Sequence, residues 1–213
     1  MRMIQAWRRL SMHPLVRPLT EWRVDRKWVR AGRPIPAPPI VKQRVLKQAL
    51  REYGLATLIE TGTFTGETVA ALARHARRIV SIELDDRLYA AARRRFAGQP
   101  HIELLHGDSG LLLPGVLASL HEPALFWLDG HYTGKNTARG EHGSPILREV
   151  TALLEHPVPG HVVLIDDARE FIGIDGYPVF EDLRRLILER HPGAVVMVAD
   201  DIIRWTPQPG GLA

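Results

Sequence analysis

Five short apolar runs of the chain end in, or next to, a carboxylate. The five acids are Glu60, Glu83, Asp108, Asp129 and Asp166. One acid at the end of a strand is ordinary, because strand termini are solvated, but five in register would be unusual in a purely structural sheet. Ligands of open parallel sheets bind beyond the carboxyl ends of the strands. The pattern therefore indicates one ligand site at one edge of a sheet.

A glycine loop directly follows the first of these acids. Gly62 and Gly66 stand four positions apart, so the loop backbone can approach a ligand where the next helix begins. The dinucleotide fingerprint G-x-G-x-x-G is missing, because position 64 is Phe. Glu83 ends the next apolar run, 21 residues after Gly62. A carboxylate there can accept both ribose hydroxyls of a nucleoside, so the two features together indicate a nucleoside site.

Apolar runs alternate with helical patterns from residue 56 onward. We expect strands at 56–60, 79–83, 102–106, 124–129 and 161–166, and helices at 67–76, 87–96, 110–120, 146–155 and about 179–191. Strands that are apolar on both faces and alternate with helices predict a parallel sheet covered on both sides. The last two runs, at 194–198 and 202–205, are joined by so short a turn that they must be antiparallel. The predicted fold class is α/β, a Rossmann-like doubly wound sheet, mostly parallel with a C-terminal antiparallel hairpin.

Residues 1–39 are expected to form a basic arm rich in Trp, Arg and Pro, in front of a main domain at 40–213. Residues 1–50 contain twelve Lys or Arg and two acids, whereas residues 51–213 carry a net charge of −6. Pro14 and Pro18 are expected to break any long helix in the arm. Residues 34–39 predict an extended spacer, followed by a helix that ends at Gly54. The arm could contact phosphates, a membrane or an acidic partner, or it could lie on the protein's own acidic surface.

The composition excludes several classes of protein. The chain has 213 residues, of which 45% are hydrophobic and 24% charged, as expected of one globular domain. Since Cys is absent, thiolate metal sites, Cys nucleophiles and disulfides are excluded. No apolar run approaches the roughly 20 residues that cross a bilayer, and the basic N-terminal region lacks the apolar stretch of a signal peptide. We therefore expect a cytoplasmic protein.

These motifs resemble the class I S-adenosylmethionine-dependent methyltransferases over about residues 40–206. Residues 60–66 match the family's acid-x-Gly-x-x-x-Gly pattern, with Thr63 where a third glycine often stands. The segments Glu-Thr-Gly-Thr, Trp-Leu-Asp-Gly-His and Ile-Asp-Asp-Ala-Arg are similar to those of a bacterial subgroup. The resemblance implies S-adenosylmethionine as cofactor, with the glycine loop on its methionine part, Glu83 on its ribose and Asp108 with its neighbours on its adenine edge. The implied cofactor-binding residues are Glu60, Thr61, Gly62, Thr63, Phe64, Gly66, Glu83, Gly107, Asp108, Ser109 and Asp129.

A second resemblance concerns a metal ion. Asp129, Asp166 and Asp167 resemble the positions at which catechol-type O-methyltransferases hold Mg²⁺, and hard oxygen ligands suit that ion. Asp167 stands where those enzymes have Asn, which adds a negative charge. The alternative is that Asp129 caps the turn after its strand, and that Asp166 or Asp167 caps the following segment.

The catalytic residues expected here are His131, Asp129 and Tyr132. His131 is the preferred general base, because an imidazole titrates near neutral pH and this one lies just beyond the end of a strand. Alternatively, it only orients Asp129 or hydrogen-bonds the next loop. The polar loop at 133–145 has the length of a substrate lid, and its Lys135 and Arg139 could meet an anionic acceptor.

Three functions remain open at this stage. The first is an O-methyltransferase acting on a small-molecule or glycan-like acceptor, with or without Mg²⁺. The second is an RNA methyltransferase guided by the basic arm. It is less favoured, because the arm lacks a recognisable RNA-binding module and the acidic sheet edge would repel phosphates. The third is a non-catalytic nucleotide-binding protein, or a peripheral membrane partner that docks through the arm.

Overall fold

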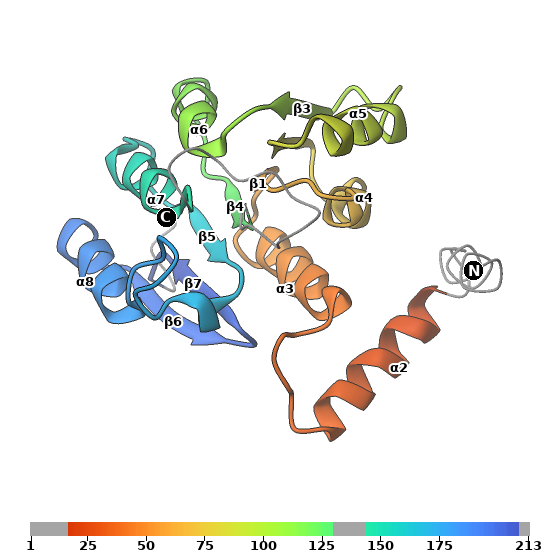
Figure 1. Cartoon of the computed structure of the whole chain (residues 1–213), viewed down its shortest axis with the longest axis horizontal. Coiled ribbons are helices and arrows are strands. Elements are labelled where there is room, and N and C mark those ends of the chain that lie inside the picture. Colours follow the sequence, from red (N-terminus) through yellow and green to blue (C-terminus); the bar gives the residue numbers. More distant parts are fainter. Residues whose placement is uncertain (1–16, 130–143, 209–213) are drawn as a thin grey trace.

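The computed structural model describes residues 17–129 and 144–208 and contains a seven-stranded sheet (Figure 1). The strand order is β3-β2-β1-β4-β5-β7-β6. β1 to β5 are parallel, and β7 runs antiparallel to both of its neighbours. The predicted fold class, with its C-terminal antiparallel hairpin, is confirmed. The strands are β1 (Thr57–Thr61), β2 (Arg78–Glu83), β3 (Ile102–His106), β4 (Leu125–Leu128), β5 (Val162–Ile165), β6 (Val195–Ala199) and β7 (Ile202–Thr206).

Helices cover both faces of the sheet, as the doubly apolar strands predict. One core joins α6, α7 and α8 to one face, and a second core joins α3, α4 and α5 to the other. Successive strand residues alternate between the two cores, so Phe126 faces the first and Trp127 the second. The helices are α2 (Arg17–Arg30), α3 (Pro39–Glu52), α4 (Glu67–Leu72), α5 (Asp86–Arg95), α6 (Ser109–Ala118), α7 (Ile146–Glu155) and α8 (Phe180–Arg190), with a 3₁₀ turn, η1 (Ala168–Glu170).

The expected elements are all found, with shifted ends. The largest difference is α4, which ends at Leu72, four residues before the expected position. Its last carbonyl group accepts hydrogen bonds from the backbone of His75 and Ala76 in a tight turn. The chain turns there because the backbone N–H of Arg77 bonds the carbonyl oxygen of Ala56 and so starts β2 beside β1.

The arm contains a helix that the sequence analysis did not expect. α2 is 14 residues long, and Pro18 does not break it, because Pro18 is its second residue, where a missing N–H needs no partner. Trp28 of α2 is buried against Ala37 and Val41, and its indole N–H donates to the carbonyl oxygen of Pro34 at 2.8 Å. This anchor fixes α2 and the spacer against the start of α3. The division into an arm and a main domain at residue 39 stays a prediction.

In the two described ranges, the structure contains no helix long and apolar enough to span a bilayer.

Candidate active site

The carboxyl ends of β1 to β5 meet at one edge of the sheet, which we call the rim. The parallel register puts the ends of neighbouring strands side by side, and backbone bonds continue this register beyond the last strand residues. The N–H of Asp129 donates to the carbonyl oxygen of Thr61, and the N–H of Asp166 donates to that of Leu128, both at 3.0 Å. The acids that end the five apolar runs therefore lie along the same edge.

Glu83 holds the glycine loop against the end of β2. Its buried carboxylate accepts the backbone N–H of Phe64 at 2.7 Å and that of Asp85 at 2.9 Å. Gly66 closes the loop with a left-handed backbone (φ 74°), and a Cβ at this position would lie 2.7 Å from a ring carbon of Phe96. Gly66 is therefore required both by its backbone conformation and by the lack of space.

Glu60 is buried beneath this loop and is bound by neutral groups. The hydroxyl of Ser81 donates to its carboxylate at 2.5 Å, and the Ser81 and Thr63 hydroxyl oxygens lie 2.6 Å apart. Burial raises the pKa of Glu60 to about 8, against the lowering effect of the Ser81 bond, and the nearby charge of Asp129 raises it further. Glu60 therefore holds a proton through most of the neutral range until a cation approaches it.

Asp108 is engaged by two structural partners at the end of the rim. It caps α6 through the backbone N–H of Gly110 at 2.8 Å, and both of its oxygens accept from one guanidinium nitrogen of Arg148, at 3.0 and 2.9 Å. A Cβ on Gly110 would lie 2.4 Å from Nε of Arg148, so the glycine leaves the space for this arginine. The expected contact of Asp108 with an adenine stays a prediction.

Asp129, Asp166 and Asp167, which we call the acidic trio, are brought together by β4 and β5. Each residue offers one carboxylate oxygen, and the three oxygens lie within 4.8 Å of one another. Burial raises the pKa of Asp166 to about 7, with a further contribution from the charge of Asp129, while Lys42 acts in the opposite direction. Asp167 has a left-handed backbone (φ 54°), which Asp tolerates better than most residues.

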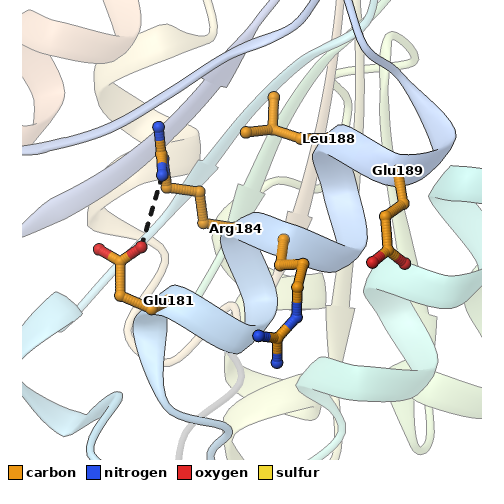
Figure 2. Close-up of a pocket in the computed structure, with 5 residues that line it drawn as sticks. Glu181, Arg184, Leu188 and Glu189 are labelled. Carbon is orange, nitrogen blue, oxygen red and sulfur yellow. Dashed lines mark hydrogen bonds and ion pairs between the residues drawn. The ribbon is translucent and has the colours of Figure 1, made fainter.

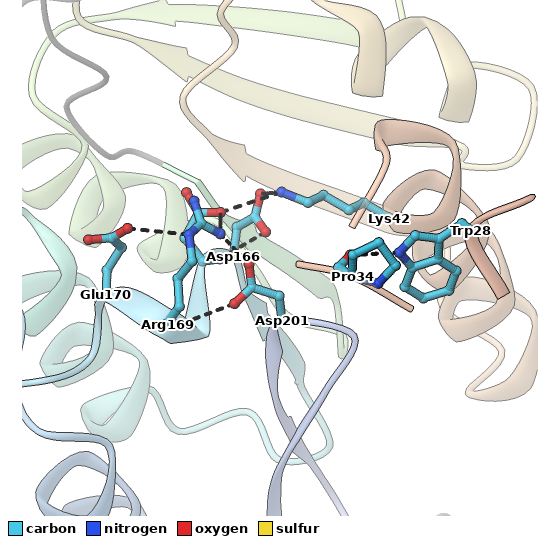
Figure 3. Close-up of polar contacts among 8 residues, drawn as sticks. Trp28, Pro34, Lys42, Asp166, Arg169, Glu170 and Asp201 are labelled. Atoms are coloured by element: carbon cyan, nitrogen blue, oxygen red, sulfur yellow. Dashed lines mark hydrogen bonds and ion pairs between the residues drawn. The ribbon is translucent and has the colours of Figure 1, made fainter. Parts of the chain in front are cut away.

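Two cationic side chains are bound to the acidic trio (Figure 3). Nζ of Lys42, from the first turn of α3, lies 2.5 Å from Oδ2 of Asp166 and 3.5 Å from Oδ1 of Asp167. Arg169, in η1, donates to Oδ1 of Asp167 at 2.7 Å, and the same nitrogen bonds Asp201. Burial alone would lower the pKa of Lys42, but the charges of the trio outweigh it and raise that pKa. Lys42 therefore carries its proton at neutral pH.

Asp201 belongs to the hairpin turn between β6 and β7. β7 in turn pairs with β5, the strand that leads to Asp166. Asp200 and Asp201 both have left-handed backbones (φ 58° and 63°), as a tight hairpin turn of right-handed strands requires. Asp201 is buried and also accepts the backbone N–H of Arg169 at 3.0 Å. Asp200 pairs with Arg33 at 3.5 Å, so the turn also holds the segment after α2. One arginine of the expected arm, Arg33, therefore contacts an acid of the β6–β7 turn, and the role of the arm stays a prediction.

The oxygen atoms of the acidic trio suit a hard cation, but Lys42 and Arg169 already bind two of the three residues. Oδ1 of Asp166 accepts the backbone N–H of Asp167 at 2.8 Å, and Oδ2 accepts Lys42. A Mg²⁺ ion on these oxygens would lie next to the like charge of the Lys42 ammonium group, which opposes its binding, so the arrangement in the structure does not fit the ion. Metal binding by Asp129, Asp166 and Asp167 stays a prediction.

Some of the expected site residues cannot be placed. His131 and Tyr132, expected to be catalytic, and Lys135 and Arg139 of the expected lid lie outside the described residues. The described ranges do contain the remaining expected residues, and all of them lie in the loops and strand ends of the rim.

Sequence reasoning missed several residues that contribute to the rim, and three of them are Lys42, Glu149 and Tyr177. Lys42 gave no signal, because it lies outside the buried stripe of its helix. Glu149 could have been found, because it is a charged residue at a core-facing position between Ile146 and Val150. Burial raises its pKa to about 7, although the hydroxyls of Ser109 and Thr61 act to lower it. Tyr177 is the third, and burial together with the charge of Asp167 raises its pKa to about 12.

A surface hollow elsewhere in the molecule is a weaker candidate for a functional site than the rim. It runs along the exposed side of α8, and its lining comes from that one helix (Figure 2). Its residues are Glu181, Arg184, Arg185, Leu188 and Glu189. Arg184 and Glu181 pair across one helical turn at 3.5 Å, as exposed charges on a helix commonly do.

Solved structures share this fold over most of the chain. The O-methyltransferase from Bacillus cereus in complex with SAH superposes with a TM-score of 0.56 at 17% identity, covering 93% of this chain and 96% of that one. The O-methyltransferase TomG from Streptomyces achromogenes, solved with SAM, gives a TM-score of 0.57 at 19% identity, covering 89% of each chain. The chain therefore has the Rossmann-like fold of the SAM-dependent methyltransferases.

A curated relative adds a similarity in sequence. Ribosomal RNA small subunit methyltransferase A from Dehalococcoides mccartyi (strain CBDB1) is 33% identical over 72 residues, which make up 32% of this chain. The match spans about a quarter (25%) of the length of that relative. No protein-family model matches the chain.

Proposed function

We propose that the chain is an S-adenosylmethionine-dependent methyltransferase that methylates an oxygen atom of a small-molecule or glycan-like acceptor. The observation that carries this proposal is the rim itself. A glycine loop held by Glu83 on one side, and a row of carboxylates on the other, lie at the carboxyl edge of a mostly parallel sheet, where ligands of such sheets bind. The fold shared with two O-methyltransferases supports the same assignment.

The rim fits the cofactor in charge and in hydrogen-bonding capacity. S-adenosylmethionine supplies a methyl group on a positively charged sulfur, and buried carboxylates favour a cation. Glu83 uses one lone pair of each oxygen on the backbone of the loop and next helix, so each oxygen can accept a further hydrogen bond from a ribose hydroxyl. Glu60 lies below the same loop, where it would face the ammonium group of the methionine part.

The chain's own residues would orient the acceptor and remove its proton. Asp129 lies at the end of β4, next to β1, where the proposed cofactor site meets the acidic trio. We assign His131, two residues further along the chain, as the general base that takes the proton of the acceptor hydroxyl. The acceptor oxygen then bonds the methyl carbon as the carbon–sulfur bond breaks, and the sulfur keeps that electron pair.

Calorimetric titration of the full chain tests the cofactor assignment. We expect S-adenosylmethionine and S-adenosylhomocysteine each to bind with one site per chain, and NAD not to bind. Binding of NAD without binding of S-adenosylmethionine would overturn the assignment. Incubation with radiolabelled methyl donor and pools of phenols, sugars and uronates then identifies the acceptor.

RNA methylation is the second candidate, and it rests on the match to a ribosomal RNA methyltransferase. The exposed basic residues of α2 also favour it, among them Arg23, Arg26 and Arg30. The carboxylates of the rim oppose it, because they repel phosphates. Incubation of ribosomal RNA fragments with the radiolabelled methyl donor, beside the small-molecule pools, decides between the two, since only a true substrate takes up the label, whereas any RNA can bind basic residues in a salt-dependent way.

A further inference from the structure

The strongest unexplained feature of the rim is the position of Lys42. Its side chain is 16% exposed, and its partners Asp166 and Asp167 are exposed by only 2% and 5%. The ammonium group reaches the rim from α3, at a sequence separation of 124 residues from Asp166. An ammonium group is a compact point charge with three donors, so one nitrogen can serve several carboxylates.

Lys42 lies where a cation of the acidic trio would lie. Nζ is close to oxygens of both Asp166 and Asp167, and the charge of Asp129 also acts on it. A second cation at the same oxygens would meet both the repulsion of the ammonium charge and the loss of the bond to Oδ2 of Asp166. Arg169 further reduces the charge available on Asp167.

The fold holds Lys42 in this position from two sides. Trp28 packs against Val41, the residue before Lys42, and Pro39 begins the helix that carries both. On the other side of α3, Leu46 and Leu50 are buried against the sheet. The lysine is therefore presented by a packed helix and not by a mobile loop, which lowers the entropy lost when the ion pair forms.

We propose that the Lys42 ammonium is the resident cation of the acidic trio, so that the rim operates without a divalent metal ion and acquires a divalent-metal site only when position 42 loses its charge. The chain thereby carries in its own sequence the positive charge that catechol-type enzymes take from Mg²⁺. The proposal goes beyond methyl transfer, because it concerns cation binding, which is measured directly.

The test is a titration of Mn²⁺ and Mg²⁺ into the full chain, followed by calorimetry and by the electron paramagnetic resonance signal of free Mn²⁺. The variants are Lys42→Met, which keeps the length of the side chain, and Lys42→Arg, which keeps its charge. Lys27→Met is the matched control, because it removes the same charge from an exposed position on α2. We expect Lys42→Met to bind Mn²⁺ at least about tenfold more tightly than the other three proteins.

Two further variants make the result decisive. In a Lys42→Met background, Asp166→Asn should remove the gained Mn²⁺ site, because it removes a ligand. If Lys42→Met does not fold, the wild type is compared with Asp166→Asn alone, and equally weak Mn²⁺ binding by both supports the proposal. A wild-type chain that binds one Mn²⁺ as tightly as Lys42→Met, or that loses a stoichiometric site in Asp166→Asn, overturns it. None of these outcomes depends on whether the chain transfers methyl groups.

Discussion

The two halves of the rim bind their carboxylates in different ways. In the half formed by β1 and β2, Glu60 and Glu83 are held by neutral donors: a serine hydroxyl and two backbone N–H groups. In the half formed by β4 and β5, Asp166 and Asp167 are held by the cations of Lys42 and Arg169. Neutral donors bring no positive charge to the first half, so a cationic ligand can supply it, whereas the second half is partly neutralised by the protein itself. The comparison supports the proposed cofactor site in the first half and the proposal that Lys42 takes the place of a metal ion in the second.

The first prediction concerns the half held by neutral donors. Glu83→Ala should weaken S-adenosylmethionine binding about 100-fold or more, because the proposed ribose acceptor and the bond that shapes the glycine loop are lost together. Calorimetric titration measures the change. Glu103→Ala is the matched control, since Glu103 is an exposed acid of the neighbouring strand. Equal affinities for the two variants would remove Glu83 from the cofactor site.

The second prediction separates backbone strain from crowding at Gly66 of the same half, with Gly98, between α5 and β3, as the reference position. Gly66→Ala and Gly98→Ala both place a side chain on a left-handed backbone (φ 74° and 83°), but only the first meets an atom, in Phe96. We expect Gly98→Ala to lower the free energy of unfolding by about 1 kcal/mol and Gly66→Ala by about 1–2 kcal/mol more. Urea unfolding measures both, and equal losses would show that Phe96 moves aside.

The third prediction concerns the half held by cations. Lys42→Met should lower the free energy of unfolding by about 2 kcal/mol, because it leaves the buried Asp166 without its counter-ion. This expected loss of unfolding free energy is smaller than the loss on breaking a fully buried ion pair, since Lys42 keeps some exposure to water. Lys27→Met should stay within about 0.5 kcal/mol of the wild type. A loss of similar size in both variants would assign the effect to net charge alone.

The fourth and smallest effect is a pH dependence of cofactor binding. Glu60 has a raised pKa of about 8, so below that pH it must release a proton before it can pair with the cofactor's ammonium group. Affinity for S-adenosylmethionine should therefore rise with pH, by roughly fivefold between pH 7 and 8. Glu60→Gln should flatten this dependence. Calorimetry in buffers of different ionisation enthalpy measures the released proton, and a wild-type affinity that is constant over this range would contradict the assignment.

The same contrast explains what could be predicted from the sequence. The contacts of Glu60 and Glu83 join residues at most 21 positions apart, in or next to one strand–loop–helix–strand unit. Strand ends, glycines and acids at such spacing follow from local patterns, so the glycine loop and the fold class could be predicted.

Two contacts of the other half join residues that no local pattern connects. Lys42 and Asp166 are 124 residues apart, and Arg169 and Asp201 are 32 residues apart. A surface lysine on an amphipathic helix looks the same in the sequence whether it contacts water or a buried carboxylate. The helix in the arm was missed for a different reason, because Pro18 marks the start of α2 where a break was expected.

The crystal structure of the full chain with S-adenosylhomocysteine tests the central claim most directly. Our account predicts that the two ribose hydroxyls bond the carboxylate of Glu83, that the amino group faces Glu60, and that the sulfur lies toward Asp129. Density for the ligand at any place other than this rim, or a rim without ligand at a saturating concentration, would contradict it.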